Sequence, residues 1–383
     1  MAGGTAMEAS KARHESGLIA ASAWTAAYDY FHDSYQAYYK TGLRAALAES
    51  GVRLVDEPLH RLPGLLHPVR RVRWARQLTP IMSRGLGRVI DSIATVIAGH
   101  RTARSREFHS LAGQYEFTFD SGRMLRLVVD VQDAGEIASE SLLKKCDVYA
   151  KSNYRLDYRY PSSVVPICNG NRVVLPHLSL LRSLRDRRPE YDVCFIVRVW
   201  GGRDEKAGVE HNLRLLEAVN KARCSKRLLA FLVTGDIDEQ EKRLRAQGIP
   251  TTRAPLRLRE LWNASASALM NVIRLGMHNC VPWRFMDLIA MGACVVFEQA
   301  PQTIWAPPLV SGEHYLELGA ATTADLPLAK DADYDSIPAR IESFVHDRAR
   351  AFLLRSRAAH YFDRYASPLA VGRQLVAHVT RAI

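Results

Sequence analysis

The sequence lacks the long apolar runs and the paired cysteines that mark several protein classes. No stretch approaches 18 uninterrupted apolar residues, which excludes an ordinary membrane-spanning helix. The six cysteines form no C-x-x-C pair and lie mostly inside apolar runs, so we expect buried free thiols and no disulfide framework. Residues 1–16 are polar and contain no apolar core of a signal peptide. These features predict a cytoplasmic protein whose first 16 residues form a disordered tail.

Several catalytic signatures are also absent. The chain has no G-x-G-x-x-G at the end of a predicted strand, no G-x-x-x-x-G-K-[ST] and no H-E-x-x-H. Their absence disfavours a dinucleotide-dependent dehydrogenase, a P-loop nucleotide hydrolase and a zinc hydrolase. No cluster of Cys and His has metal-ligand spacing. We therefore expect neither a metal site nor a cofactor.

Acidic residues are too few to balance the basic ones. Lys and Arg number 52 against 40 Asp and Glu, which gives a net charge of +12 in 383 residues. A composition of 48% hydrophobic and 24% charged residues is typical of a soluble globular protein, and the length allows two to three domains. The excess of positive charge predicts an anionic partner, which could be a phosphate-bearing substrate, a nucleic acid or an anionic membrane surface.

The pattern of apolar runs predicts an α/β fold. In the first half, residues 17–58 read as strand, helix and strand, and Asp33 with Gln36 form a capping-box pattern at the start of the helix. A hairpin is expected around Asp120-Ser121-Gly122, with its second arm ending at Asp130. After a charged segment near residue 185, strands and helices alternate again. We predict an N-terminal domain over residues 17–185 and a C-terminal domain with closing helices over residues 186–383.

Two segments of the second half carry residues suited to a nucleotide. In FIVRVWGGRDEKAGVE, a strand delivers Arg198, the loop contains Gly202 and Arg203, and Lys206 precedes a helix, so cations and helix N–H groups can meet a diphosphate. In VPWRFMDLIAMGACVVF, Arg284 and Asp287 stand one helical turn apart, where they could meet a phosphate and a ribose. A solvated surface turn and a simple ion pair remain the alternative interpretations.

These two segments resemble the nucleotide-sugar-binding domain of GT-B glycosyltransferases of the group-1 type. The resemblance covers about half of the chain, from residue 192 onward, and implies two Rossmann-like domains facing a central cleft, with C-terminal helices packing back. It implies that Arg203 and Lys206, with Arg198 as the alternative, hold the diphosphate of a nucleotide-sugar donor and that Asp287 binds the ribose in place of the family's glutamate. His278 and Asn279 stand where sugar contacts are expected, although Asn279 replaces a second family glutamate.

The base that removes the acceptor's hydroxyl proton should follow a strand of the N-terminal domain. Asp133, His32 and Asp130 meet that requirement in the sequence. His32 is expected in a loop after the first strand, and Asp130 could equally pair with an arginine. The three residues remain open candidates.

Two other functions are compatible with the sequence. A sugar-nucleotide 2-epimerase would use the same two-domain scaffold. A basic nucleic-acid-binding protein would use the arginine-rich residues 61–106, which also suit an anionic acceptor or the inner face of a membrane. The acceptor could be a glycan, a lipid-linked sugar, a modified nucleobase or a natural product, and the sequence does not define the oligomeric state.

Overall fold

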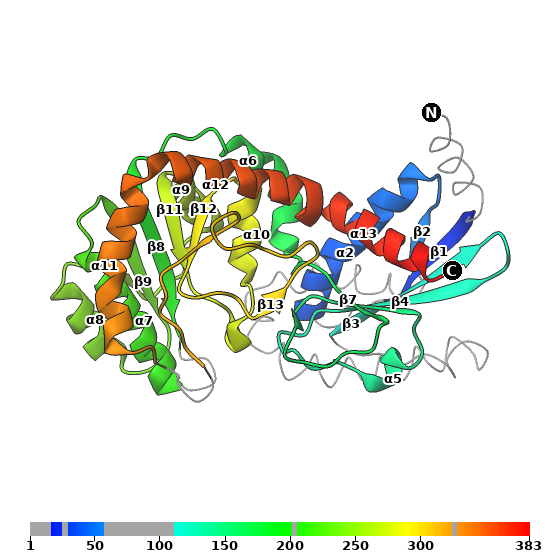
Figure 1. Ribbon diagram of the computed structural model, residues 1–383, viewed down its shortest axis with the longest axis horizontal. Coiled ribbons are helices and arrows are strands. Elements are labelled where there is room, and N and C mark those ends of the chain that lie inside the picture. Colours follow the sequence, from blue (N-terminus) through cyan, green and yellow to red (C-terminus); the bar gives the residue numbers. More distant parts are fainter. Residues whose placement is uncertain (1–16, 25–29, 57–110, 201–204, 324–327) are drawn as a thin grey trace, which may run out of the picture. The chain divides into compact units, whose positions relative to one another are not determined.

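The computed structural model describes residues 17–24, 30–56, 111–200, 205–323 and 328–383. Two compact units divide these residues (Figure 1). The first unit comprises the chain up to Arg172 together with Pro368–Ile383, and the second comprises Val173–Ser367. Each unit is a Rossmann-like α/β domain built on its own six-stranded sheet, as the sequence predicted. The division lies before residue 185, and the last helix returns to the first unit.

The first unit contains a mixed sheet with the strand order β2-β1-β3-β4-β5-β7. Its elements are β1 (Leu18–Trp24), α2 (Tyr30–Glu49), β2 (Leu54–Asp56), β3 (Ala112–Phe119), β4 (Met124–Asp130), α5 (Glu140–Leu143), β5 (Val148–Lys151), β6 (Tyr154–Arg155), β7 (Val164–Pro166) and α13 (Pro368–Arg381). β1 and β2 are parallel, which confirms the first strand-helix-strand unit. β3 and β4 are antiparallel and form the expected hairpin, which ends at Asp130. β4, β5 and β7 are parallel to one another.

The start of α2 differs from the sequence prediction. The helix begins at Tyr30, so His32 and Asp33 lie within its first turns and not in a loop. Gln36 therefore does not complete a capping box with Asp33. Its side chain is buried, donates from Nε2 to the carbonyl of Val129 at 2.8 Å, and accepts from the hydroxyl of Tyr115. The side chain of Gln36 thus holds α2 against the sheet. The local spacing of residues in the sequence does not reveal such a contact.

Helices α2 and α13 pack against each other through two glycines (Figure 1). A Cβ atom on Gly42 would collide with the carbonyl of Pro368, and one on Gly372 would collide with the carbonyl of Gly42. Only residues without a side chain allow the two backbones to approach this closely. The C-terminal segment is therefore held on the first unit by a contact between residues 330 positions apart in the sequence.

The second unit contains a parallel sheet with the strand order β10-β9-β8-β11-β12-β14. Its strands are β8 (Tyr191–Val199), β9 (Lys226–Leu232), β10 (Thr251–Thr252), β11 (Ala268–Ile273), β12 (Cys294–Phe297), β13 (Thr303–Ile304) and β14 (Leu316–Glu317). Its helices are α6 (Leu178–Ser183), α7 (Glu205–Lys221), α8 (Ile237–Arg245), α9 (Leu258–Ala266), η5 (Met277–Asn279), α10 (Trp283–Ala290), α11 (Asp331–His346), α12 (Arg348–Tyr361) and η6 (Phe362–Ala366), and η4 (Arg172–His177) lies at the division.

Both faces of this second sheet are covered, which explains the continuous apolar run of β8. Successive side chains of a strand point to opposite faces. Phe195 and Val197 accordingly pack into the larger core with side chains of α7 and α11. Cys194 and Ile196 pack on the other face with Ala264 of α9. A strand buried on both sides leaves polar groups only at its ends, so the chemistry of this unit is concentrated at the edges of the sheet.

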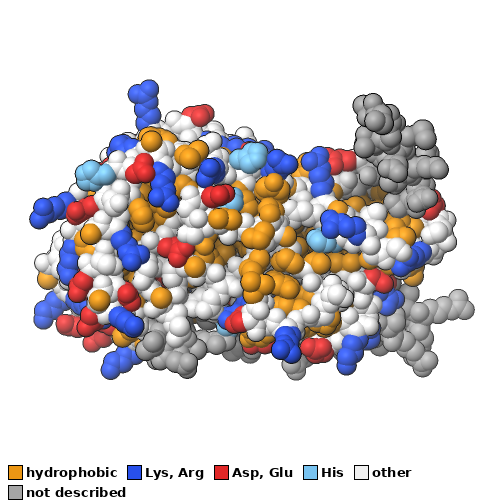
Figure 2. All heavy atoms as spheres, viewed as in Figure 1, with side chains coloured by type: hydrophobic (Ala, Val, Ile, Leu, Met, Phe, Trp, Pro, Cys, Tyr) orange, Lys and Arg blue, Asp and Glu red, His pale blue; other side chains and the backbone are white. Residues whose placement is uncertain are grey.

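The surface carries charges of both signs. On the face shown in Figure 2, Lys and Arg side chains are interspersed with Asp and Glu. All six cysteines are free thiols, four of them buried. In the ranges that the structure describes, no helix has the length and apolarity needed to cross a membrane. The arginine-rich residues 61–106 lie outside these ranges.

The glycine contact between α2 and α13 predicts a strong effect of one added methyl group. Gly372→Ala should lower the free energy of unfolding by about 1–3 kcal/mol, because the helices must separate to admit the Cβ atom. Thermal unfolding followed by circular dichroism measures the change. Ala45→Ser, on the exposed face of α2, is the control and should unfold like the wild type. An unchanged midpoint for Gly372→Ala would show that the helices do not approach as closely as described.

Candidate functional site

The strand order of the second sheet defines where a ligand can bind. From β8 the chain moves to β9 and β10 on one side, and it then returns to β11 and β12 on the other side of β8. The connections after β8 and β11 therefore diverge at the carboxyl ends of these two neighbouring strands. In open α/β sheets this switch point opens a crevice in which ligands bind. The residues that follow β8, β11 and β12 are thus the candidate functional site.

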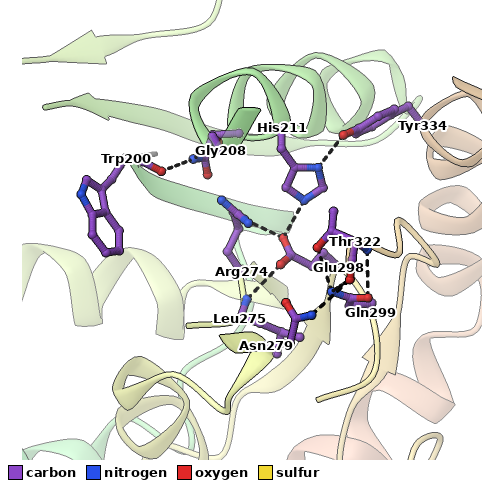
Figure 3. Close-up of polar contacts among 11 residues, drawn as sticks. Trp200, Gly208, His211, Arg274, Leu275, Asn279, Glu298, Gln299, Thr322 and Tyr334 are labelled. Carbon is purple, nitrogen blue, oxygen red and sulfur yellow. Dashed lines mark hydrogen bonds and ion pairs between the residues drawn. The ribbon is translucent and has the colours of Figure 1, made fainter. Parts of the chain in front are cut away.

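The end of β8 presents cationic and aromatic side chains beside a helix N-terminus. Arg198 is exposed, and its guanidinium carbon lies 5.9 Å from the centre of the Trp200 ring. The carbonyl of Trp200 accepts a hydrogen bond from Nδ2 of Asn212 on α7 at 3.0 Å, which fixes the strand end to the helix (Figure 3). Lys206 is exposed in the first turn of α7. Gly202 and Arg203 lie outside the described residues, so their roles stay predictions.

A buried carboxylate joins the ends of the neighbouring strands. Glu298 follows β12, is 1% exposed, and accepts from Nε of Arg274 at 2.7 Å (Figure 3). The same carboxylate lies 3.2 Å from Nε2 of His211, whose Nδ1 lies 2.5 Å from the hydroxyl of Tyr334. The amide of Leu275 also donates to Glu298. One side chain thereby connects the end of β11, the end of β12, α7 and α11.

The charge states of this cluster follow from burial and from its partners. Burial by itself raises the pKa of Glu298, but Arg274 and His211 outweigh it and hold the pKa below its ordinary value. Burial lowers the pKa of His211, although Glu298 opposes the shift. At neutral pH the cluster therefore contains an ionised Glu298 paired with Arg274, and a neutral His211. These residues were not among the predicted site residues, although a charged residue directly after a buried strand is a sequence signal that marks Arg274 and Glu298.

Short helix η5 places His278 and Asn279 beside this cluster in an unusual backbone conformation. Their φ angles are +65° and +54°, in the left-handed region that disfavours residues other than glycine. The amide nitrogen of the Asn279 side chain donates to the carbonyl of Thr322 at 3.1 Å (Figure 3). Gln299, which follows Glu298, exchanges hydrogen bonds with Thr322. Two consecutive residues held in this region store strain, which is typical of ligand-binding segments.

Arg284 and Asp287 are used inside the second unit. Arg284 is half-buried and donates to the carbonyl of Ile196 and to the hydroxyl of Ser265. Asp287 is 5% exposed, and its Oδ2 accepts from Nε1 of Trp262 at 3.0 Å. In the structure both side chains make hydrogen bonds within the second unit, and their contacts to phosphate and ribose stay predictions. The i, i+3 spacing indicated a shared face of the helix but not which face is buried.

In the first unit, Asp130 ends β4 and Asp133 lies in the loop that follows, and the two carboxylates have different surroundings. Asp130 is fully buried, pairs with Nζ of buried Lys151 at 3.1 Å and accepts from the hydroxyl of Tyr149 at 2.9 Å. Two backbone amides also donate to it. Asp133 is half-buried in the following loop. Burial raises its pKa, and Lys151 only partly opposes this. The structure describes no side chain for His32.

The buried cluster predicts how the stability of the protein depends on pH. Because the pKa of Glu298 is lowered in the folded protein, its carboxylate stabilises the fold above the ordinary pKa, and this contribution disappears as the pH falls through the folded value. Glu298→Gln should lower the free energy of unfolding at pH 7.5 by about 2–3 kcal/mol. This is less than for a fully buried pair because Arg274 is 24% exposed.

Thermal unfolding of the wild type and Glu298→Gln between pH 7.5 and pH 4 measures this contribution. The difference between their midpoints should be largest at pH 7.5 and should shrink toward acid. The exposed Glu313 supplies the control variant Glu313→Gln, for which no difference is expected. A gap that widens on acidification would contradict the assignment of an ionised Glu298.

Known proteins match this chain in three-dimensional structure only. No protein-family model and no curated protein matches the chain. Over most of its length the structural neighbours are GT-B glycosyltransferases. Anabaena HepE in complex with UDP and glucose has 12% identity and a TM-score of 0.43, with 88% of both chains covered. A Rickettsia africae glycosyltransferase has 10% identity and a TM-score of 0.43, with 91% of this chain and 96% of that chain covered. The C-terminal domain of a Francisella tularensis group-1 glycosyltransferase (LpcC) has 11% identity and a TM-score of 0.33, with 48% and 90% covered.

Proposed function

We propose that this protein is a glycosyltransferase that moves a sugar from a nucleoside-diphosphate sugar to a hydroxyl acceptor. The observation that carries the proposal is the combination of Arg198 and Lys206 with the N-terminus of α7 at the switch point of the second sheet. Two exposed cations and the N–H groups at the start of a helix favour the same ligand, a diphosphate. The sequence resemblance of residues 198–208 to the donor segment of group-1 enzymes favours a sugar nucleotide.

The donor's other contacts are assigned to the same edge of the sheet. Trp200 is 37% exposed and offers an aromatic face beside Arg198. His278 stands in the strained turn after β11, where the sugar would lie beyond the diphosphate. The cluster around Glu298 sits behind these residues and holds the strand ends and α7 in place. Positive charge and helix N–H groups at this edge stabilise the nucleotide diphosphate as it leaves.

The acceptor's proton is assigned to Asp133. A general base works best when its pKa lies close to the operating pH, and burial moves the pKa of Asp133 in that direction. Asp130 already accepts four hydrogen bonds, including one from Lys151, and its role is to hold the end of β4 and β5 together. Attack by the acceptor oxygen on the anomeric carbon would then deliver the hydroxyl proton to Asp133.

The reaction is tested by incubating the purified protein with UDP-, GDP-, dTDP- and CMP-sugars and following the products by mass spectrometry. UDP-glucose is the first donor to test, because a structure of Anabaena HepE contains it. Release of the nucleotide with hydrolysis or transfer of the sugar is expected. If the protein binds none of these donors, or only isomerises the free nucleotide sugar, the proposed function is wrong.

The donor site predicts a loss of affinity on removal of one charge. Lys206→Ala should weaken binding of the nucleoside diphosphate by about 1.5–3 kcal/mol, because a charge-assisted contact to phosphate is lost. The same substitution should weaken the binding of the nucleoside monophosphate much less. Isothermal titration calorimetry measures both. Lys221→Ala removes an exposed lysine from the last turn of the same helix and should bind like the wild type. Equal affinity for Lys206→Ala and the wild type would place the diphosphate elsewhere.

The two carboxylates after β4 predict opposite phenotypes. Asp133→Asn should lower kcat by a factor of about 10²–10⁴ and leave donor affinity and the unfolding midpoint unchanged, since only proton transfer is affected. Asp130→Asn should instead lower the free energy of unfolding by about 3–5 kcal/mol, because it leaves Lys151 buried without its counter-charge. Steady-state kinetics and thermal unfolding of both variants separate the roles. Full activity of Asp133→Asn would reject Asp133 as the base.

A further inference from the structure

A second polar site lies at the amino ends of the strands of the second sheet. A cavity of about 620 Å³ is formed where the chain enters β8 and β12 and where α12 crosses these strand starts. The candidate donor site, by contrast, follows the carboxyl ends of the strands. The cavity is lined by Arg185, Asp186, Arg187, Arg188, Pro189, Gly292, Arg348, Phe352, Arg355, Ser356 and Ala359. All of these residues belong to the second unit.

Arg355 is the buried cation of this cavity. The residue is only 7% exposed, and its Nε donates to the carbonyl of Gly292 at 3.2 Å. Its Nη2 donates to the carbonyls of Arg185 and Arg187 at 3.3 and 3.2 Å. Nη1 has no hydrogen-bond partner in the described part of the chain, although it is buried. Three neutral carbonyls position the guanidinium without neutralising it, and a buried cation without a counter-charge is costly.

Three of the other four arginines of the cavity pair with carboxylates that do not line it. Arg185 pairs with Asp363 at 2.6 Å, Arg187 with Glu190 at 3.0 Å, and Arg348 with Asp192 at 2.9 Å. These bonds hold the guanidinium groups in place around the cavity. Arg188 is exposed and makes no ion pair within the described ranges. Asp186 is the single acidic residue among the lining side chains. The wall of the cavity is therefore predominantly cationic.

We propose that this cavity is a binding site for a phosphate-bearing anion, which is attracted by the buried guanidinium of Arg355 and held by the arginines at the rim. A guanidinium matches phosphate in geometry and in charge, and several of them around one concave surface favour a phosphate over a neutral ligand. The volume also accommodates a group larger than phosphate itself. This site is separate from the donor site and does not depend on the proposed transferase activity.

Two sources of the phosphate have to be distinguished, a soluble phosphoryl compound and a lipid headgroup. Phe352 lines the cavity and is 47% exposed, and the adjacent Leu353 on α12 is 50% exposed. Apolar side chains next to cations suit a lipid headgroup with its acyl chains nearby. Leu353 therefore serves as the residue that separates the two sources, since a soluble ligand does not need it.

Binding of a soluble phosphoryl group is measured by titrating the full chain with inorganic pyrophosphate, with and without saturating UDP. Arg355→Gln should weaken binding at the cavity by a factor of about 10 or more, because the buried positive charge that attracts the anion is lost. The double variant Arg188→Ala/Arg348→Ala changes only the rim and should produce a similar loss, so the test survives if Arg355→Gln does not fold. Arg259→Ala, an exposed arginine on α9, is the control and should bind normally. Lys206→Ala, in the candidate donor site, should leave unchanged the pyrophosphate binding that remains in the presence of saturating UDP.

Binding of a lipid headgroup is measured by co-sedimentation with phosphatidylcholine vesicles that contain or lack phosphatidic acid. Binding only to the phosphatidic acid vesicles, lost in the rim variant and weakened by Leu353→Ser, would identify a lipid. Pyrophosphate binding that requires the cavity arginines, without vesicle binding, would identify a soluble ligand. If neither probe binds, or if binding survives both arginine variants, the cavity is not an anion site.

Discussion

The buried charge of Glu298 is the constraint around which the second unit is organised. A carboxylate taken out of water needs a counter-charge and hydrogen bonds, and here they come from Arg274, His211 and the amide of Leu275. These partners belong to the end of β11, to α7 and to the turn before η5. Neutralising one side chain thus sets the relative position of three segments. The N-terminus of α7, with Lys206, is held near the strand ends as a consequence.

The first unit uses the same device at the carboxyl end of β4. Asp130 is neutralised by Lys151 at the end of the neighbouring parallel strand β5, and the hydroxyl of Tyr149 completes the set. In both units, a charged pair between adjacent strand ends is fully used in holding the edge of the sheet together. Residues nearby that do not take part, such as Asp133 and Lys206, stay available for a substrate. Charged residues at strand ends therefore fall into two groups. Those in buried pairs hold neighbouring strand ends together, and those outside such pairs can contact a ligand.

The carboxyl and amino ends of the strands of the second sheet differ in how their arginines are neutralised. At the carboxyl ends of the strands, the half-buried Arg274 is matched by buried Glu298, and the exposed cations stand on a strand end and a helix N-terminus. At the amino edge Arg355 is matched only by carbonyl groups, and Nη1 is left without a partner. A matched cation stabilises the protein, whereas an unmatched one attracts an anion from outside. This difference separates a structural cluster from a candidate binding site on the same sheet.

The sequence by itself determined the two α/β units, the hairpin ending at Asp130 and the segments after β8 and β11, because apolar periodicity and turn residues are local properties of the chain. The orientation of individual side chains was decided only by the tertiary structure. Spacing placed Arg284 and Asp287 on one face of α10, but their hydrogen-bond partners, Ser265 and Trp262, are brought to that face only by the fold. Likewise, the side chain of Gln36 donates to the carbonyl of Val129 on β4, which is 93 positions away in the sequence. Glu298, His211 and Arg355 acquired their roles from elements that meet only in the folded chain, since burial and counter-charges depend on packing and not on local pattern.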